Sequence, residues 1–217
     1  ALLELYENDI SKHNGKIDAG RILLVFRSLV TQLSKEHEKF VYGCVKQGAR
    51  AREFEVAIEW LVSAGLVLRV YDVKKPEHPL KVFEDFSSFK LFFFDVGLAK
   101  YAAGVSNESI ILNTGFQFKG ALTENYCLQQ FRGQFEVFPH YYSPLRNYEV
   151  DFLLQNEMQI IPVECKAGEN VTSASFKRYR KEESPSLAIR FSTLQYKEQE
   201  DMINVPLYLA GRIKQIL

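Results

Sequence analysis

The sequence predicts an α/β protein in which helices come first and strands alternate with helices in the second half. Apolar residues recur at helical spacing over residues 19–33 and again over 50–63, which predicts two amphipathic helices near the start. Further on, a short polar turn separates two apolar segments rich in β-branched and aromatic residues, 149–154 and 160–166. These observations place a helical segment before a sheet.

Asp18 precedes the first helix, where its side chain is expected to cap exposed backbone N–H groups. Residues 40–42 are expected to be extended, and Gly65 is expected to end the second helix. The elements that follow are a strand over 66–71, a polar loop over 74–79, a strand over 89–94 and a short helix from Asp95 to near Gly104. Helix, helix, strand, loop and strand is the order of a winged helix.

A winged helix commonly binds DNA by placing a recognition helix in the major groove. Here the second helix carries Arg50 and Arg52, but its polar side also carries Glu53, Glu55 and Glu59. Because these carboxylates would repel phosphate, we expect this segment to serve as a spacer between proteins rather than as a DNA reader.

The polar stretch Val105–Ser109 is the expected boundary between a helical or winged-helix segment, 1–107, and an α/β domain, 108–217. In the second domain, Asn113–Thr114 is expected to cap a helix that runs to Phe131. The later elements are a strand over 135–142, a turn marked by Pro144 and Asn147, the strands 149–154 and 160–166, a helix over 173–181 and a strand over 186–192.

The hairpin of the second domain is expected to bring three charged side chains together. Side chains alternate between the two faces of a strand, so Glu164 and Lys166 point the same way. If the turn centres between Glu157 and Met158, Asp151 lies opposite Glu164. A slip of two residues would keep Asp151 on that face, whereas a slip of one residue would remove it.

These residue types fit metal-dependent phosphodiester cleavage. Two carboxylates, Asp151 and Glu164, can hold Mg²⁺, which prefers oxygen ligands and keeps several waters. The metal would activate a bound water, and Lys166 can orient that water or neutralise the phosphate. Taken alone, the same pattern is also met on an ordinary solvated strand face.

Glu124 is a fourth candidate group. It shares a helical stripe with Ala121, Leu128 and Phe131, and a carboxylate on a mostly apolar stripe usually has a partner. A metal cluster would supply that partner, and so would a salt bridge to Lys166 or to an arginine.

The order of a helix with Glu124, a strand, a strand with Asp151, a strand with Glu-x-Lys, a helix and a strand resembles the PD-(D/E)XK restriction-endonuclease-like fold. That resemblance implies a central mixed sheet flanked by helices. More narrowly, the chain resembles the C-terminal region of a large family of predicted bacterial and archaeal AAA-type ATPases. In that family a P-loop ATPase domain and a winged helix precede a nuclease-like domain. The stretches that carry the resemblance are 39–40, 59–67, 89–98, 120–125, 149–152 and 162–166.

Composition limits the classes of function. The chain has 27 basic and 27 acidic residues, whereas a strong sequence-independent DNA binder is usually basic. One local basic cluster occurs on the expected helix 173–181, where phosphate contact and a solvated face near a helix C-terminus explain it equally well. Its members are Lys177, Arg178, Arg180 and Lys181.

No apolar run is long enough for a transmembrane helix and no signal peptide is present, so we expect a cytoplasmic protein with no membrane partner. Cys44, Cys127 and Cys165 lie far apart, so we expect buried thiols rather than zinc ligands or disulfides. The histidines show no ligand spacing, and we expect His140, the nearest to the hairpin in sequence, to be structural.

The chain begins within a helical pattern and without methionine, so we expect it to be part of a longer polypeptide. It has no G-x-x-x-x-G-K-[ST] motif, and the resemblance places ATP binding in an N-terminal P-loop ATPase domain of that polypeptide.

The main hypothesis is a Mg²⁺-dependent DNA nuclease, with Asp151 and Glu164 as metal ligands and Lys166 at the water. Glu124 would be an outer ligand. The rival is a non-catalytic module that binds nucleic acid or a partner protein for the ATPase. A third hypothesis is a transcription-factor-like DNA binder that acts through the winged helix.

Overall fold

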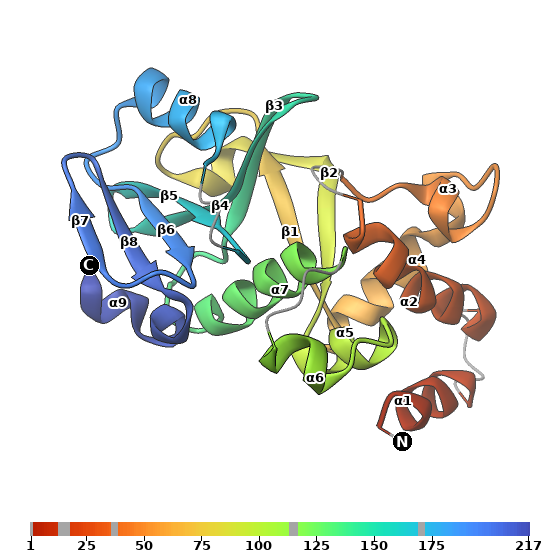
Figure 1. Cartoon of the computed structure of the whole chain (residues 1–217). Helices are drawn as coiled ribbons and strands as arrows, with labels where there is room; N and C mark the ends of the chain where they lie inside the picture. Colours follow the sequence, from red (N-terminus) through yellow and green to blue (C-terminus); the bar gives the residue numbers. More distant parts are fainter. Residues whose placement is uncertain (1, 13–17, 36–38, 113–116, 169–171) are drawn as a thin grey trace. The chain divides into compact units, whose positions relative to one another are not determined.

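The structure, a computed structural model, describes residues 2–12, 18–35, 39–112, 117–168 and 172–217 (Figure 1). The chain divides into two compact units, each built from two stretches of sequence. The N-terminal unit comprises Ala1–Arg69 and Lys90–Leu122, and the C-terminal unit comprises Val70–Phe89 and Thr123–Leu217. Since neither unit is continuous in sequence, this division does not test a single boundary at residue 107, which stays a prediction.

The N-terminal unit is mainly helical. Its helices are α1 (Leu2–Ser11), α2 (Ala19–Leu33), α3 (Tyr42–Val45), α4 (Ala51–Ser63), α5 (Val96–Ala102) and α6 (Asn107–Ile111). The apolar stripes of α2 and α4 are buried, as Ile22, Leu29 and Ile58 show. The two predicted amphipathic helices are therefore confirmed, although Arg50 lies at the N-cap of α4 and not inside it.

Polar residues and one glycine set the ends of these helices. Asp18 caps α2 as predicted, because its carboxylate accepts a hydrogen bond from the Gly20 N–H at 2.8 Å. The Asp95 carboxylate caps α5 by accepting from the Leu98 N–H at 3.0 Å. Gly65 has a φ of +71°, so the chain leaves α4 through a left-handed conformation that favours glycine.

The structure also contains helices that the sequence does not indicate. Residues 40–42 are predicted to be extended, but α3 begins at Tyr42. Within the polar stretch 105–109, the Ser106 hydroxyl accepts from the Ser109 N–H at 3.1 Å and so caps α6. The cap predicted at Asn113–Thr114 lies outside the described residues.

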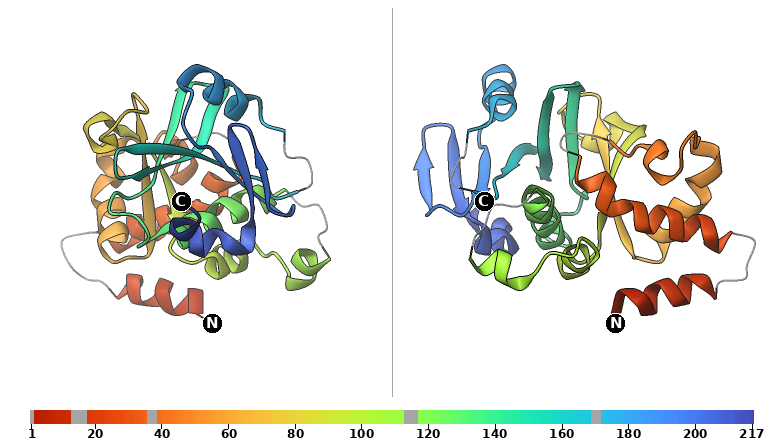
Figure 2. Two further views of the ribbon diagram at one scale, coloured as in Figure 1. Left: turned by 90° about the vertical axis from the view of Figure 1, so that its left-hand side faces the viewer. Right: turned by 45° about the vertical axis from the view of Figure 1, so that its right-hand side comes forward.

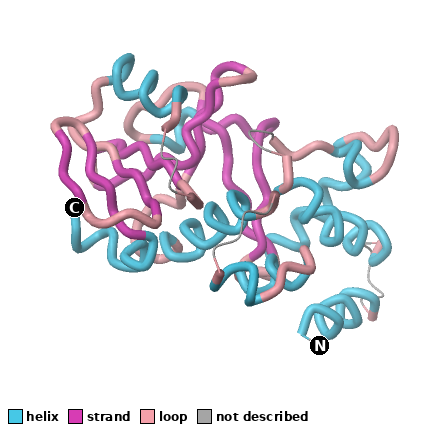
Figure 3. The backbone as a smooth tube through the Cα atoms, viewed as in Figure 1, coloured by secondary structure: helices cyan, strands magenta, loops and turns pink. Residues whose placement is uncertain are grey.

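Within the described ranges, eight strands form one mixed sheet in the order β2-β1-β3-β4-β5-β6-β8-β7. Figure 3 draws the strands in magenta. They are β1 (Val67–Val73), β2 (Glu84–Phe93), β3 (His140–Leu145), β4 (Tyr148–Asn156), β5 (Gln159–Cys165), β6 (Ile189–Ser192), β7 (Lys197–Gln199) and β8 (Met202–Pro206). Parallel pairing joins β1 to β3, β5 to β6 and β6 to β8, whereas β3–β4, β4–β5 and β7–β8 are antiparallel. The predicted α/β class, with a central mixed sheet flanked by helices, is confirmed.

The element order of a winged helix is present from α2 to β2. In the C-terminal unit, however, β1 pairs in parallel with β3, with Asp72 opposite Tyr141. The strands after the second helix therefore also extend the large sheet. The winged-helix assignment itself stays a prediction.

Two helices cover opposite faces of strands β4–β6 in the C-terminal unit, α7 (Lys119–Phe131) on one face and α8 (Ala174–Glu183) on the other (Figures 1 and 2). The Phe131 ring of α7 lies with its centroid 5.7 Å from that of Phe152. On the other face, Tyr179 of α8 belongs to a buried cluster with Leu153. Because consecutive residues of β4 face opposite helices, both sides of this strand are core.

Several strands differ from the prediction. The strand predicted over 135–142 begins only at His140 and continues through Pro144, beyond the point at which β3 pairs with β1. A proline is tolerated there because no ladder partner on that side needs its N–H. Strands β7 and β8 are not predicted at all. The unit is completed by two 3-10 helices, η1 (Leu80–Phe83) and η2 (Leu207–Arg212), and by α9 (Ile213–Ile216).

Candidate active site

The β4–β5 hairpin has the predicted register. Its Cα pairs run without a break from Phe152 and Val163 to Asn156 and Gln159, and leave a two-residue turn. The first turn residue, Glu157, has a φ of +52°, as such a tight turn requires. Extended by one residue beyond Phe152 and Val163, this register would place Asp151 opposite Glu164.

At the open end of this hairpin, a side chain accepts a hydrogen bond from a backbone N–H of the neighbouring strand. The Asp151 carboxylate accepts a hydrogen bond from the Cys165 N–H at 2.7 Å. This bond satisfies a buried donor and fixes the carboxylate between the two strands. Asp151 and Glu164 are only 5% and 2% exposed, so both carboxylates lie almost out of reach of bulk water.

Burial raises the pKa of Asp151 well above its usual range, and the nearby carboxylates of Glu164 and Glu124 raise it further. The hydrogen bond from Cys165 acts in the opposite direction. Glu124 is half-buried and belongs to α7. Acids from a helix and two strands therefore act on one another here, and the roles predicted for them stay predictions.

Lys166 balances part of this negative charge. Its Nζ lies 2.6 Å from Glu164 Oε1. The Lys166 side chain is 25% exposed, so solvent reaches part of it although Glu164 is buried. Burial lowers the pKa of Lys166, but the charge and hydrogen bond of Glu164, together with Asp151 and Glu124, outweigh burial and raise it. The lysine is therefore a cation at neutral pH and can donate a proton only weakly.

The four basic residues predicted on α8 have different surroundings, and their contact with nucleic acid stays a prediction. Lys177 and Lys181 are exposed. Arg178 pairs with Glu182 at 2.7 Å and lies over the Tyr148 ring, 4.5 Å from its centroid. Arg180 pairs with Asp201 at 2.6 Å and lies over the Phe176 ring, 5.5 Å from its centroid.

Sequence reasoning missed two residues beside the site. Arg190 of β6 is in register with Glu164, and Asn204 of β8 is in register with Arg190. The available signal was a single charge inside the apolar segment Ala188–Phe191, since such a charge usually has a partner. The partner could not be identified because β8 was not predicted.

The two hairpin carboxylates fit a divalent cation. Glu164 Oε2 is buried and has no hydrogen-bond partner within the described part of the chain. A hard cation such as Mg²⁺ would satisfy this oxygen and relieve the repulsion that raises the pKa of Asp151. Over the same described residues, no group of three or more His, Cys, Asp or Glu side chains is placed to hold a metal ion. Mg²⁺ commonly uses one or two carboxylates, with waters and phosphate as its other ligands.

Other candidate residues have structural contacts. His140 is 2% exposed, and its Nε2 lies 2.7 Å from Glu84 Oε1. Burial lowers its pKa, whereas the Glu84 carboxylate raises it. Cys127 and Cys165 are buried thiols as predicted, but Cys44 is only half-buried, because it lies in the short helix α3.

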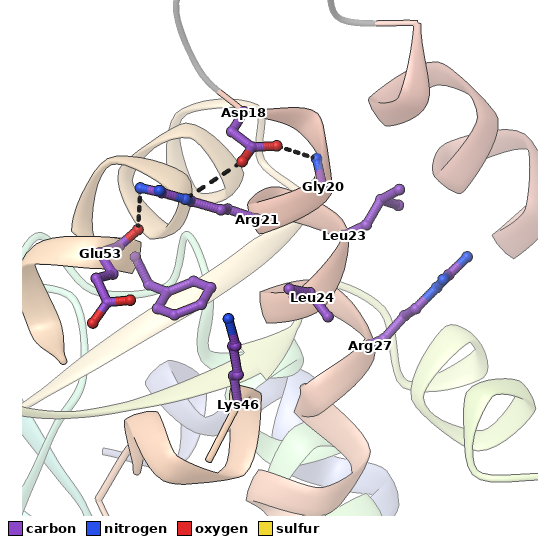
Figure 4. A pocket seen from close by; sticks show the side chains of 9 residues that line it. Asp18, Gly20, Arg21, Leu23, Leu24, Arg27, Lys46 and Glu53 are labelled. Carbon is purple, nitrogen blue, oxygen red and sulfur yellow. Dashed lines mark hydrogen bonds and ion pairs between the residues drawn. The ribbon is translucent and has the colours of Figure 1, made fainter. Parts of the chain in front are cut away.

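The N-terminal unit contains a pocket of about 500 Å³ at the start of α2 (Figure 4). Asp18 accepts from the Gly20 N–H and lies 3.4 Å from Arg21 Nε. Arg21 also donates to the Glu53 carbonyl oxygen at 3.1 Å, and apolar side chains such as Leu24 complete the lining. The acidic residues are used in capping and pairing, so this pocket carries no arrangement that points to catalysis.

Two family models match the chain. The first, described as a domain of unknown function (DUF8612), matches residues 1–109, and the second, a domain of unknown function (DUF4143), matches residues 119–209. No curated protein and no solved structure gives a significant match. Among the described residues, no helix combines the length and apolarity needed to cross a bilayer.

Proposed function

The chain belongs to the family described as a domain of unknown function (DUF8612), whose model spans half of it, and with this as the starting point we propose that its C-terminal unit is a Mg²⁺-dependent nuclease. The observation that carries the proposal is the buried pair Asp151 and Glu164. Of these two carboxylates, one has a raised pKa and the other has a buried oxygen without a hydrogen-bond partner within the described residues, so Lys166 offsets only part of the cost of burying them.

Each residue of the site has a proposed role. Asp151 and Glu164 hold the metal, and the Cys165 N–H keeps the Asp151 carboxylate oriented toward it. Mg²⁺, when bound, lowers the pKa of a bound water and offsets the charge that builds on the phosphate. Lys166, a cation with an exposed edge, orients the attacking water or neutralises the phosphate. Glu124 acts as an outer ligand from α7.

We also propose that this chain serves a P-loop ATPase domain of the AAA type within a longer polypeptide. The support is the resemblance of its motifs to the C-terminal region of such proteins, together with the absence of a P-loop from the sequence. This chain alone is therefore expected not to bind ATP. Calorimetric titration with Mg-ATP measures this, and a stoichiometric complex would contradict it.

A cleavage assay tests the nuclease. The protein is incubated with single- and double-stranded DNA and RNA in Mg²⁺ or Mn²⁺, with EDTA as the blank. We expect metal-dependent cleavage that Asp151→Asn and Glu164→Gln each reduce at least about a hundredfold, because one carboxylate cannot hold so strongly hydrated a cation. Lys166→Ala should slow cleavage and leave metal binding intact, since ammonium is not a metal ligand.

The matched control is Glu157→Gln, which makes the same charge change at the exposed turn of the same hairpin and should leave cleavage unchanged. Cleavage that persists in Asp151→Asn would reveal a contaminating nuclease. Failure of every substrate and metal combination would favour the second candidate function.

That second candidate is a non-catalytic module that binds nucleic acid or protein for the ATPase. One contact favours it: Lys166 already pairs with Glu164 at 2.6 Å, so the lysine has a structural partner before any substrate arrives. In such a module, Lys166→Ala would lower stability by leaving a buried carboxylate uncompensated, and there would be no activity to lose.

A further inference from the structure

The hairpin of β3 and β4 projects beyond the strands on either side of it. On one side, Asp72 of β1 is in register with Tyr141 of β3, and β1 ends one residue later at Val73. On the other side, the ladder between β4 and β5 begins only at Phe152. Residues 143–150 therefore form a two-stranded ribbon that neither of these described ladders includes. In Figure 1, β3 extends past the end of β1.

The base of this ribbon is held from two sides. The Asp72 carboxylate accepts a hydrogen bond from the Ser143 N–H at 3.0 Å. From α8, the Arg178 guanidinium lies over the Tyr148 ring, 4.5 Å from its centroid, and the Tyr148 hydroxyl donates to Glu182 at 3.2 Å. Tyr148 itself is only 3% exposed. The ribbon is therefore anchored at its base and presents its turn in a fixed direction.

The turn at the end of the ribbon is exposed and carries one charge. Its two residues are Arg146 and Asn147, because Leu145 pairs with Tyr148. Leu145 is 56% exposed, and Pro144 and Arg146 are exposed as well. Within the described residues, the Arg146 guanidinium makes no ion pair or hydrogen bond. The turn therefore presents a cation beside apolar side chains.

Carboxylates at the base of the ribbon are buried or already used. Glu149 is 3% exposed, and Glu182 pairs with Arg178 at 2.7 Å. Burial raises the pKa of Asp72 to about 6, although the hydrogen bond from Ser143 lowers it. Since none of these acids pairs with Arg146 in the described part of the chain, the turn itself is positive and suits a polyanion.

We propose that the end of this ribbon, residues 144–147, enters the major groove of duplex DNA beside the Asp151–Glu164 pair. Two strands with their side chains fit a groove about 12 Å wide, whereas the minor groove, about 6 Å wide, is too narrow for them. In the major groove, Arg146 contacts a backbone phosphate at the groove edge, and Leu145 makes apolar contact with base edges such as a thymine methyl group.

This surface rests on the proposed function, because it says how the duplex to be cut is held. Arg146 precedes Asp151 by five residues. In an extended chain this is at most about 17 Å, or about five base pairs at about 3.4 Å each. A duplex bound at the ribbon can therefore also reach the carboxylate pair. Arg146 is a binding residue in this scheme and not a catalytic one.

The test compares binding of a labelled DNA duplex with binding of its separate strands, by fluorescence anisotropy in EDTA, where no Mg²⁺-dependent cleavage can occur. Each phosphate contact contributes about 0.9 to the slope of log affinity against log salt for duplex DNA. We expect Arg146→Gln to reduce this slope by about 0.9 and to weaken duplex binding about tenfold at low salt. Arg146→Lys keeps the charge and should keep the slope.

Two further measurements test the groove. Leu145→Ala should weaken duplex binding severalfold and leave the salt slope unchanged, because it alters the ribbon without altering its charge. Methyl green, which occupies the major groove, should displace the protein from the duplex, whereas netropsin, which occupies the minor groove, should not. Displacement by netropsin alone would overturn the groove assignment.

Arg132→Gln is the matched control, because it removes another exposed arginine of the C-terminal unit, outside the ribbon. It should leave affinity and slope unchanged. Since the turn is exposed, the ribbon variants should melt like the wild type, which circular dichroism checks. The proposal is overturned if Arg146→Gln has the slope of Arg132→Gln, if it loses as much affinity for single strands as for the duplex, or if the wild type does not bind the duplex at low salt.

This experiment and the cleavage assay can fail separately. If cleavage is absent but Arg146→Gln lowers the salt slope for the duplex, the nuclease proposal fails and the DNA-binding ribbon stands. If Asp151→Asn abolishes cleavage but Arg146→Gln binds the duplex as Arg132→Gln does, the nuclease stands and the ribbon proposal is wrong.

Discussion

The carboxylate site of the C-terminal unit and the α2 pocket of the N-terminal unit both contain acidic and basic side chains. The two sites differ in how exposed these side chains are to solvent and in how their charges are paired. At the pocket, the side chains of Asp18 and Arg21 are 60% and 52% exposed, and each has a local partner. At the hairpin, Asp151 and Glu164 are nearly inaccessible, and like charges adjoin. The charged groups at the pocket are paired and exposed, whereas burial and neighbouring acids disfavour the ionised form of Asp151 at the hairpin.

The two sites differ in what their charges imply about function. Exposed charges in high dielectric contribute little and need no functional explanation. A buried carboxyl group such as that of Asp151, whose pKa is raised by burial and by neighbouring acids, opposes folding when it is ionised, so its presence requires a compensating ligand or role.

The largest effect expected from this comparison is on activity. Asp151→Asn should reduce Mg²⁺-dependent cleavage at least about a hundredfold, because the metal loses a charged ligand, whereas Asp18→Asn should not change it. The initial rate of cleavage of a labelled oligonucleotide measures both. Equal losses in the two variants would mean that the two acidic sites do not differ in function.

A stability measurement sharpens the comparison. The folded-state pKa of Asp151 lies well above 3.8, so its proton stabilises the fold at low pH, and this contribution is lost as pH rises through the folded pKa. Asparagine cannot ionise. Asp151→Asn should therefore melt higher than the metal-free wild type at about pH 8, by about 2–4 °C for each kcal/mol gained, and this gain should shrink toward about pH 5.

Mg²⁺ should narrow the same gap, because it binds the wild-type carboxylate and not the amide. Differential scanning calorimetry with and without Mg²⁺ measures both effects. A variant that melts lower than the wild type at every pH would identify Asp151 as part of a stabilising ion pair, and the contrast with the pocket would then disappear.

At the pocket, the free energy of unfolding should depend on the Asp18 helix cap and not on the Asp18 charge. Asp18→Ala is expected to cost about 1 kcal/mol in the free energy of unfolding, because the Gly20 N–H loses its acceptor. Asp18→Asn keeps an acceptor and should cost no more than about a few tenths of that. Urea denaturation of both variants gives the values. A large loss in Asp18→Asn would show that the charge at this pocket matters as much as the charge at the hairpin.

The smallest effect concerns the ion pair beside the pocket. Arg27 Nε lies 2.9 Å from Glu7 Oε1, and the Arg27 side chain is 60% exposed. Arg27→Gln is expected to cost less than about 1 kcal/mol and to become neutral in about 1 M salt, where the Debye length is short. Chemical denaturation at low and high salt measures this, and a cost that salt does not reduce would contradict surface exposure as its cause.

The sequence predicts local features better than distant pairings. The caps at Asp18 and Asp95 and the β4–β5 register depend on residues close together in the chain, so local pattern is sufficient. Arg190 and Asn204 meet only through parallel ladders among β5, β6 and β8, which no local pattern specifies.

Two other misses have their own causes. Strand β7 consists of Lys197, Glu198 and Gln199, all exposed, so it shows no apolar alternation. Helix α6 begins in a run of serine and asparagine that favours loops as strongly as helix caps. In both places the tertiary pairing or the cap decides the structure, and the composition does not.

The two-residue turn at Glu157 and Met158 has an evolutionary consequence. While this turn is kept, two residues that face each other across the hairpin must be separated by an odd number of positions, as Phe152 and Val163 are. Relatives with a longer or shorter hairpin should therefore gain or lose residues in twos, one from each strand. A single insertion within β5 would move Glu164 and Lys166 to the other face of the sheet and put apolar side chains in their place.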